Sequence, residues 1–577
     1  MKKIILPLLL LLFFYGIIGK AQKPLTGDYF GSPLRIKLDA TGTFAEIRSN
    51  HFHSGVDFKT MGKSGLPVIA VADGLVSRIK ISPVGFGNAL YIDHPNGYTS
   101  VYGHLSGYNK TVSDYAFKKQ YESEQFAVDL FPAGEGDTIS VKKGDIIGYS
   151  GNSGTSFGAH LHFEMRTTST ERILNPYLFG YQNSDIFYPY FELLKIYPMD
   201  NVSSVVNSPD PVLYSVKNTG TGTYALSGKD TIALWGRFAI GVQAFDYTYS
   251  REDRNGFYGI RMYLDNNMFF SMQCDSFAFA ESRNINACID YAANYRFGQR
   301  IVKSNRLPGN GMSIFKTPSG DGIISVFDTL DHQLVIEVYD VLGRTSKLSV
   351  PVVGRQPAQY VSAPEPLDAD TVINVAWNRD TNIDYKDIRI NMPSGSLYEN
   401  LEMMVKRTPQ VAGLYSARYM LHNPEVPLQK RISISLKTDK VPPSLLSKAL
   451  IVSINPKTAR RSAEGGNLTS GWITTETNEF GTYAIAIDTI KPKLKVVPQK
   501  ASTAKSLKIN VSDNLSGIAF YRGEINGEWV LVEWDPKNHL MIYRYDQMLK
   551  SGKNSFRLTV RDAAGNETVI TSVILRK

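Results

Sequence analysis

Apolar and polar residues alternate along most of this chain. Segments 67–79 ("PVIAVADGLVSRI") and 144–151 ("GDIIGYSG") are typical of short strands joined by Gly turns, and 160–165 ("HLHFEM") has the period of two of a strand. No stretch between residues 35 and 170 keeps the period of a helix over several turns. The pattern therefore predicts a mainly β fold for this part of the chain.

From about residue 190 the alternation continues, with breaks at Gly, Asn, Asp and Pro, as in β-sandwich domains. A chain of 577 residues is too long for one hydrophobic core, so several domains are expected. Segment 334–350 ("LVIEVYDVLGRTSKLSV") is echoed by 556–573 ("FRLTVRDAAGNETVITSV"), which indicates repeated modules and, in the second copy, resembles bacterial immunoglobulin-like domains. We predict a β-sandwich over 195–355, a β-rich module over 356–488 and an immunoglobulin-like β-sandwich over 489–577.

The chain opens with two lysines and an apolar run that ends near Ile18. Gly19 and Ala21 are small residues of the kind that a signal peptidase reads. Because the run is short for a membrane span of about 20 residues, we favour a signal peptide over 1–21 and a mature chain from Gln22 over a retained anchor. No later segment is apolar and long enough to cross a bilayer. We therefore expect export to the periplasm or cell envelope, or to the extracellular space, without a membrane anchor.

Charge and cysteine content give little evidence for a particular partner. The net charge of +9 is spread over the whole chain, and Lys2, Lys3 and Lys20 leave with the signal. Such an excess does not indicate a polyanionic partner, and no nucleic acid is expected. Cys274 and Cys288 either pair in an oxidising compartment or remain as two buried thiols.

Histidines, which can act in catalysis or bind metal, are concentrated before residue 165. Six of the nine histidines lie there, and four of them form two His-x-His pairs. The strand-like alternation of the second pair puts His160, His162 and Glu164 on one face. The Gly- and Ser-rich segment before it, "GYSGNSGTSFG", predicts a tight turn rather than a phosphate loop, because no Gly-Lys-Ser/Thr follows.

A catalytic zinc site takes three protein ligands from His, Asp and Glu and leaves a fourth position for water. His53, Asp57 and His162 can supply these ligands. Zinc lowers the pKa of its water from about 15.7 towards about 7, which gives a hydroxide nucleophile at neutral pH. The H-E-x-x-H motif is absent, so the base must come from elsewhere, and His104 and His160 are the candidates.

Packing or turn formation is a simpler explanation for single members of this set. A lone His-x-x-x-Asp is common, His94 in "YIDHPNGY" fits a hairpin turn, and His51 is a similar case. The three motifs H-x-x-x-D, Y-G-H-L and G-A-H-L-H-F-E, in this order, are much harder to obtain from packing alone.

Four segments between residues 35 and 170 resemble the lysostaphin/LytM-type zinc metalloendopeptidases. These are "HFHSGVDFKT" (51–60), "GLPVIAVADGLVSRI" (65–79), "GFGNALYIDHPNGYTSVYGHLS" (85–106) and "VKKGDIIGYSGNSGTSFGAHLHFEMR" (141–166). The resemblance implies that one Zn²⁺ per catalytic domain is bound by His53, Asp57 and His162. It favours His53 over His51, because the family pattern is His-Ser-Gly-Val-Asp.

The same resemblance assigns the catalytic roles. His104 and His160 match the two catalytic histidines of the family, which polarise the water and stabilise the tetrahedral intermediate. The implied fold is an antiparallel β domain with a duplicated hybrid motif and a groove walled by loops, which we place at 22–190. An insertion at about 107–137 is longer than the usual connection of the family, and we expect it to form a helical lid or a substrate wall.

The function implied is an exported zinc metalloendopeptidase that hydrolyses the peptide cross-links of bacterial peptidoglycan. The cross-link is either a glycine bridge or the direct D-alanyl bond to a diamino acid of the stem peptide, and we favour the direct bond. One alternative is a peptidoglycan-binding regulator or scaffold that keeps the fold without cleavage, and another is an adhesive surface protein. The C-terminal β modules either bind a glycan or protein partner or act as spacers.

Overall fold

The structure is a computed structural model. It describes residues 27–181, 186–228, 231–247, 253–317, 320–357, 368–498 and 505–576. The predicted signal peptide over 1–21 lies outside the described residues. Within the described ranges, no helix is both long and apolar enough to span a bilayer. The same ranges contain eight sheets and three α-helices, so the predicted mainly β class is confirmed.

The first domain is built on an antiparallel sheet, as expected for its alternating sequence. Its core contains Val56, Phe58, Ile92 and Phe163, which point to the buried side of their strands. The strand order is β1 (Ala40–Gly42), β4 (Val56–Lys59), β13 (His160–Thr167), β8 (Tyr98–Leu105), β7 (Asn88–Asp93), β6 (Gly74–Ile81) and β10 (Val128–Leu130), with β11 (Ser140–Val141) beside β6 and β14 (Ile173–Leu174) beside β13.

Two smaller sheets complete this domain. One is a three-stranded sheet, and the other is a two-stranded hairpin that precedes β4. Their strands are β5 (Pro67–Ile69), β12 (Ile146–Tyr149) and β9 (Gly107–Tyr108), and β2 (Ile47–Arg48) with β3 (His51–Phe52).

The predicted insertion contains a helix, α1 (Lys110–Ser123). The side chain of Asn109 caps it by accepting a hydrogen bond from the backbone N–H of Val112. Val112 and Ala116 are buried against the domain core, and Glu124 ends the helix in the left-handed conformation. The helix contacts β9 and β10, and its C-terminal end also contacts the fourth domain.

The second domain differs from the predicted β-sandwich. Its strand β26 pairs with β18 and also with β19, so the sheet closes on itself through the consecutive neighbours β19, β15, β17, β18 and β26. Alternation shows which side of a strand is buried, but it does not distinguish a closed sheet from two stacked sheets. The strand order is β16 (Ser204–Val205), β19 (Ile232–Phe245), β15 (Tyr190–Pro198), β17 (Val212–Gly220), β18 (Thr223–Leu226), β26 (Thr345–Gly354), β25 (Asp331–Tyr339), β20 (Gly259–Leu264) and β21 (Asn267–Gln273), with β23 (Val302–Lys303) and β24 (Ile324–Val326) beside β19.

The first and second domains share a hydrophobic core. Phe44 and Phe52 of the first domain pack with Phe277 of the second, with ring centroids 5.0 and 5.7 Å from it. The short strand β22 (Ser276–Phe277) also pairs with β14, and α2 (Ile285–Cys288) and α3 (Tyr291–Phe297) follow it. Cys274 and Cys288 lie in this core as two buried free thiols, which is one of the two predicted states, rather than as a disulfide.

The third and fourth domains are two-sheet sandwiches, because residues of both sheets share one core in each. The third domain pairs β27 (Thr371–Val375), β30 (Leu401–Thr408), β31 (Arg418–Leu421), β37 (Gly481–Ile487), β33 (Ala449–Ile454) and β34 (Arg461–Gly465), and stacks on them β28 (Thr381–Tyr385), β29 (Ile388–Met392), β32 (Pro427–Lys437), β36 (Trp472–Glu479) and β35 (Asn467–Thr469). The fourth has β38 (Lys493–Val496), β39 (Ser506–Ser512), β43 (Leu540–Arg544) and β42 (Val532–Asp535), and β41 (Glu528–Val530), β40 (Ile518–Ile525), β44 (Gly552–Asp562) and β45 (Glu567–Arg576).

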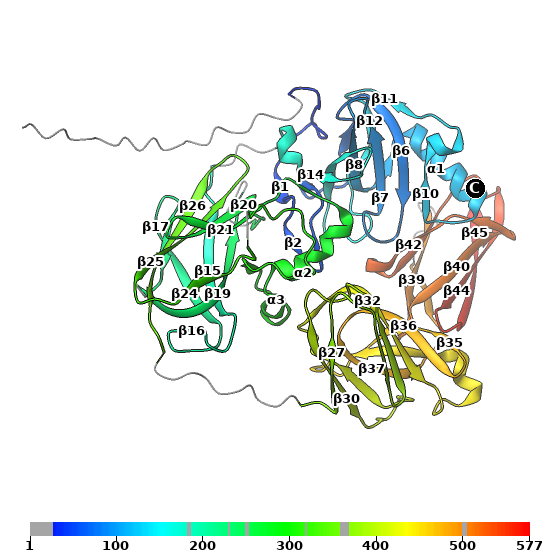
Figure 1. Cartoon of the computed structure of the whole chain (residues 1–577). Helices are drawn as coiled ribbons and strands as arrows, with labels where there is room; N and C mark the ends of the chain where they lie inside the picture. The colour runs from blue at the N-terminus through cyan, green and yellow to red at the C-terminus, as the bar shows by residue number, and fades with distance from the viewer. Residues whose placement is uncertain are drawn as a thin grey trace, which may run out of the picture.

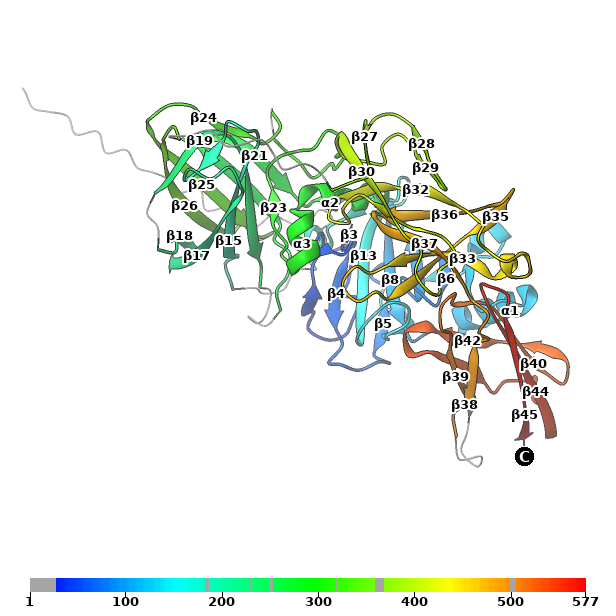
Figure 2. The ribbon, with the colours of Figure 1, turned by 90° about the horizontal axis from the view of Figure 1, so that it is seen from below.

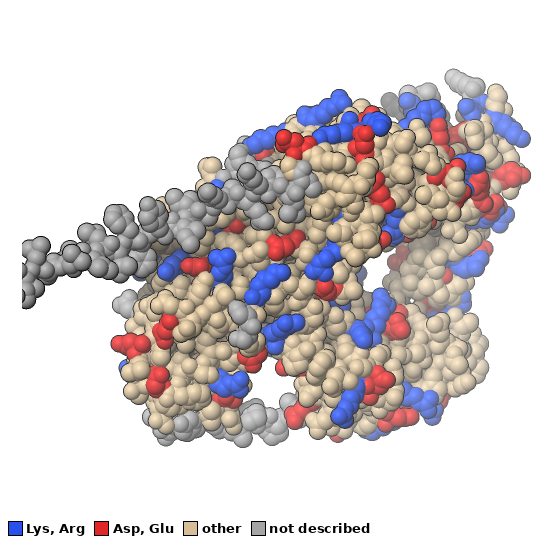
Figure 3. Space-filling model, turned by 45° about the horizontal axis from the view of Figure 1, so that its top comes forward, with Lys and Arg blue, Asp and Glu red and all other residues tan. Residues whose placement is uncertain are grey.

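The four domains are arranged in a ring, in which each domain contacts the next one along the chain and the fourth contacts the first (Figures 1 and 2). Arg283 of the second domain donates hydrogen bonds to two carbonyl oxygens of the third, at 2.9 Å each. Lys448 of the third domain donates to the carbonyl oxygen of Ala564 in the fourth at 2.9 Å. Tyr121 in α1 packs on Trp529 of the fourth domain, which closes the ring of domains. Figure 3 shows positive and negative side chains interspersed over the visible face, without a large region of one sign.

Candidate metal centre

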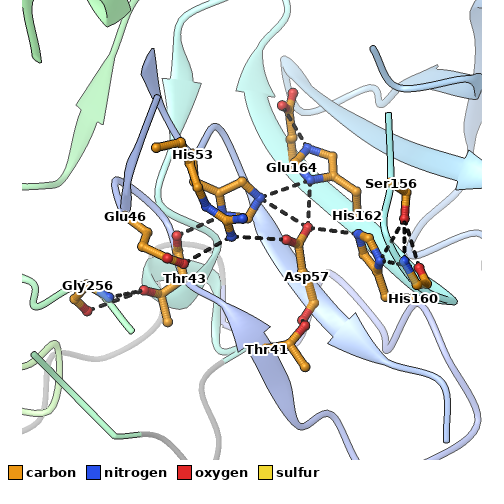
Figure 4. Close-up of polar contacts among 12 residues, drawn as sticks. Thr41, Thr43, Glu46, His53, Asp57, Ser156, His160, His162, Glu164 and Gly256 are labelled. Carbon is orange, nitrogen blue, oxygen red and sulfur yellow. Dashed lines mark hydrogen bonds and ion pairs between the residues drawn. The ribbon is translucent and has the colours of Figure 1, made fainter. Parts of the chain in front are cut away.

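Three predicted ligand side chains converge on one point (Figure 4). His53 follows β3, Asp57 lies in β4 and His162 in β13, and the strand register places Asp57 directly opposite His162. His53 Nε2 lies 3.0 Å and His162 Nδ1 lies 2.9 Å from the same oxygen, Asp57 Oδ1. The three residues are only 2–8% exposed. One ligand atom from each therefore lies within 4.8 Å of the others, in a buried setting.

Hydrogen bonds behind the histidines fix which ring nitrogen faces this point. His53 Nδ1 lies 2.8 Å from the carbonyl oxygen of Thr43, to which it donates, so Nε2 is directed at Asp57. His162 Nε2 lies 3.1 Å from Glu164 Oε1, so Nδ1 is the nitrogen directed at Asp57. Metal-ligating histidines usually have such a carbonyl or carboxylate behind them, because it orients the ring and raises its basicity. The arrangement therefore fits a metal ion.

The charges of the site also favour a cation. Burial alone would lower the pKa of His162, but the hydrogen bonds and charges of Asp57 and Glu164 raise it to about 9. Burial would raise the pKa of Asp57, yet His53 and the neighbouring rings hold it well below its ordinary value. Burial would also raise the pKa of Glu164, but the charge of Arg166 and the hydrogen bond and charge of His162 lower it to about 2. Buried carboxylates need a positive partner, and a metal ion can take the place of the proton on His162.

The two predicted catalytic histidines lie beside the ligand group. The ring of His104 is 4.8 Å from that of His160 and 5.8 Å from that of His162, centroid to centroid. His160 Nε2 lies 3.4 Å from Asp57 Oδ1. Burial, together with the neighbouring rings, lowers the pKa of His104 to about 3, so this ring is neutral at pH 7. Its Nδ1 donates to the carbonyl oxygen of Ser153 at 2.9 Å, which leaves Nε2 as an acceptor.

Backbone conformation at this site is unusual. His104 has φ of +59°, a region that residues other than Gly rarely adopt and that is often found at functional sites. Gly154, in the predicted Gly-rich turn, has φ of +69°, and a Cβ atom there would lie 2.3 Å from the carbonyl oxygen of Gly85. This close approach joins the turn to the loop that carries Phe86, whose ring stacks on His162 at 4.7 Å. The two loops together form one wall beside the histidines.

The other histidines of the first domain do not join the group. His51 is exposed, and its Nδ1 lies 2.8 Å from the carbonyl oxygen of Ser49. His94 lies in the turn between β7 and β8, as predicted, and its two ring nitrogens lie within 2.9 Å of a backbone carbonyl oxygen of Asp73 and the hydroxyl of Ser100. The motif-based choice of His53 over His51 therefore agrees with the geometry.

Sequence reasoning did not assign roles to several groups around the site. Glu164 lies on the predicted strand face, but its role behind His162 is not predicted, and neither is that of Arg166, which donates to Glu164 and packs over Phe279 of the second domain at 4.7 Å. The alternation of "HLHFEMR" was the available signal for both. Two other groups have no such signal in the sequence. Arg48 Nη2 lies 3.4 Å from Asp57 Oδ2, and the carbonyl oxygen of Thr43 accepts from His53.

A second group of acidic side chains lies elsewhere in the described part of the chain. Asp488, Asp513 and Asp562 offer oxygens within 4.8 Å of one another where the third and fourth domains meet. This group has no histidine and is contributed by domains other than the first.

Comparisons with known proteins agree with this geometry. Residues 51–121 match the model of Peptidase family M23, and residues 373–488 match that of the Zu5-like domain. An "Uncharacterized metalloprotease" of Haemophilus influenzae is 36% identical over 124 residues, which cover 22% of this chain and 20% of that protein. The "DD-carboxypeptidase/endopeptidase Mpg" of Neisseria meningitidis is 32% identical over 114 residues, 20% of each chain.

Lysostaphin of Staphylococcus simulans is matched both as a curated protein and as a solved structure. The curated protein is 33% identical over 118 residues, 20% of this chain and 18% of that protein. The solved structure of its catalytic domain is 28% identical, covers 24% of this chain and 87% of that chain, and gives a TM-score of 0.18. The chain thus spans about a fifth of the length of the curated relatives described. The first domain of this protein is therefore similar to the metallopeptidase domains of the lysostaphin, or M23, type.

Proposed function

We propose that this protein is an exported zinc endopeptidase that hydrolyses peptide cross-links of bacterial peptidoglycan. The observation that carries the proposal is the convergence of His53, Asp57 and His162 beside His104 and His160 in an M23-type domain. The donor set of two imidazoles and one carboxylate is that of a catalytic zinc site with a position left for water.

The residues of the chain have separate tasks in the proposed reaction. Zinc, when bound, acts as a Lewis acid and lowers the pKa of its water from about 15.7 towards about 7. Neutral His104 accepts a hydrogen bond at Nε2 and orients the attacking water, because its Nδ1 is held by Ser153. His160 directs Nε2 at the site, since its Nδ1 lies 2.9 Å from the carbonyl oxygen of Gly158. It exchanges a proton there and stabilises charge on the carbonyl oxygen under attack.

The proposed substrate is the direct cross-link between D-alanine and a diamino acid. One relative is named a DD-carboxypeptidase/endopeptidase, which supports a bond of this kind, whereas another is named a glycyl-glycine endopeptidase. The two bonds leave different new amino termini, a diamino acid in the first case and glycine in the second.

The test is digestion of purified peptidoglycan by the mature protein with zinc, with and without a chelator, followed by mass spectrometry of the new amino termini. We expect chelator-sensitive termini on a diamino acid. Termini on glycine would reassign the substrate. The absence of new termini, from protein shown to bind zinc, would refute cleavage and support a peptidoglycan-binding regulator.

A further inference from the structure

The end of α1 is a docking surface for the fourth domain (Figures 1 and 2). The hydroxyl of Tyr121 donates a hydrogen bond to the carboxylate of Asp546, and its ring packs edge-on against Trp529, with centroids 4.9 Å apart. Trp529 is 8% exposed. Arg522 Nη1 lies 2.5 Å from Glu124 Oε2 at the same junction. An aromatic contact, a hydrogen bond and an ion pair therefore hold the fourth domain against the insertion.

A second contact joins the fourth domain to the wall of the metal centre. Lys537 lies in the short 3-10 helix Pro536–Asn538, η5, which presents it to the Gly-rich turn before β13. Its ammonium group donates hydrogen bonds to the carbonyl oxygens of Asn152 and Ser156, the second at 2.9 Å. Hydrogen bonds from a charged donor are stronger than neutral ones. One side chain of the fourth domain thus holds two points of this turn, four residues apart.

The turn held by Lys537 supports both catalytic histidines. The carbonyl oxygen of Ser153, between the two anchored residues, accepts the hydrogen bond from His104 Nδ1. Ser156 Oγ lies 3.3 Å from His160 Nδ1 and donates to the carbonyl oxygen of Gly158, which also accepts from that ring. A displacement of this turn would therefore move the partners of both rings.

We propose that the fourth domain contributes to the peptidase site through Lys537, which acts as a positioning residue. It holds the turn over residues 152–158 so that His104 and His160 keep their orientation. The insertion, through Tyr121, brings Lys537 to this place. The effect on turnover rests on the proposed function, whereas the effect on the order of the turn does not.

The test uses the full mature chain and the variant Lys537→Met, which keeps most of the side chain and removes the ammonium group. Lys553→Met is the matched control, because Lys553 is an exposed lysine of the same domain on β44. Hydrogen exchange of the peptide over residues 151–159 reports the order of the turn. Turnover of a cross-linked muropeptide gives kcat and KM, and zinc content is measured alongside.

For Lys537→Met we expect faster exchange over residues 151–159, kcat lower by about fivefold, which corresponds to about 1 kcal/mol, and unchanged KM and zinc content. Lys537→Arg should keep most of kcat. Tyr121→Ala, which removes the contact with Trp529, should also give faster exchange over residues 151–159. Exchange at wild-type rates in both Lys537→Met and Tyr121→Ala would overturn the proposal. So would unchanged kcat in Lys537→Met. If the wild type cleaves no peptidoglycan, the proposed function fails, and the exchange rates still decide whether Lys537 orders the turn.

Discussion

Glu164 and Arg166 form a buried ion pair behind His162, and replacing Glu164 tests whether this pair supports the metal centre. Glu164 is fully buried, and its carboxylate accepts from His162 Nε2 at 3.1 Å and from Arg166 Nε at 2.7 Å. Glu164→Gln keeps the shape but removes the negative charge and leaves the buried guanidinium without its carboxylate. Removing one partner of a buried ion pair costs about 3–5 kcal/mol. Loss of the carboxylate behind a metal-ligating histidine weakens metal binding about 10–100-fold.

We therefore expect Glu164→Gln to lower the free energy of unfolding of the metal-free protein by about 3 kcal/mol, measured by urea titration. The Kd for zinc, measured by competition with a chromophoric chelator, should rise at least about tenfold. The control is Glu171→Gln, because Glu171 lies 4.0 Å from Arg166 but its side chain is 74% exposed. Exposed pairs of this kind contribute about 0–1 kcal/mol. A zinc Kd within about twofold of wild type in Glu164→Gln would refute the claim that Glu164 holds His162 as a ligand.

Three other predictions concern the ligands, the turn before β13 and the cysteines. His53→Ala should lose both zinc, measured after dialysis, and peptidoglycan cleavage, whereas His51→Ala should keep both; retention of cleavage by His53→Ala would contradict the ligand set. Gly154→Ala should lower the free energy of unfolding by about 1–3 kcal/mol, because φ is +69° and its Cβ would clash with backbone, whereas Gly158→Ala, with no atom within 4 Å of its Cβ, should be neutral in the same urea titration. Burial raises the pKa of both cysteine thiols to about 12, so at about pH 8 very little thiolate forms. Iodoacetamide should then label the unfolded protein twice and the native protein not at all, and rapid native labelling detected by mass spectrometry would contradict their burial.

The convergence of the ligand side chains could be predicted because part of its signal is local, whereas the choice of His53 over His51 came from the family resemblance. The spacing between His53 and Asp57 lies within one short segment, and the alternation of β13 places His162 on a defined strand face. Antiparallel pairing of β4 with β13 then brings Asp57 opposite His162, as the structure shows. The mainly β class followed from the same alternation.

The arrangement of the domains could not be predicted in this way. The closure of the second domain depends on β26 pairing with two strands that lie more than 100 residues earlier in the chain, which alternation does not encode. The contacts of Tyr121 and Lys537 join residues about 400 positions apart, and each is an ordinary surface side chain in its own segment. The insertion, predicted to form a helical lid or a substrate wall, contains the helix α1, and the contact of its C-terminal end with the fourth domain had no signal in the sequence.

The proposed function requires one zinc ion, held by the first domain, for cleavage of a peptidoglycan cross-link. The most direct measurement is a titration of metal-free mature protein with zinc while the cleavage of a purified cross-linked muropeptide is followed. We predict that activity rises with added zinc and stops rising at about one equivalent per chain, since one group of ligands is expected per catalytic domain. Cleavage by the metal-free protein, or none after full loading with zinc, would contradict it.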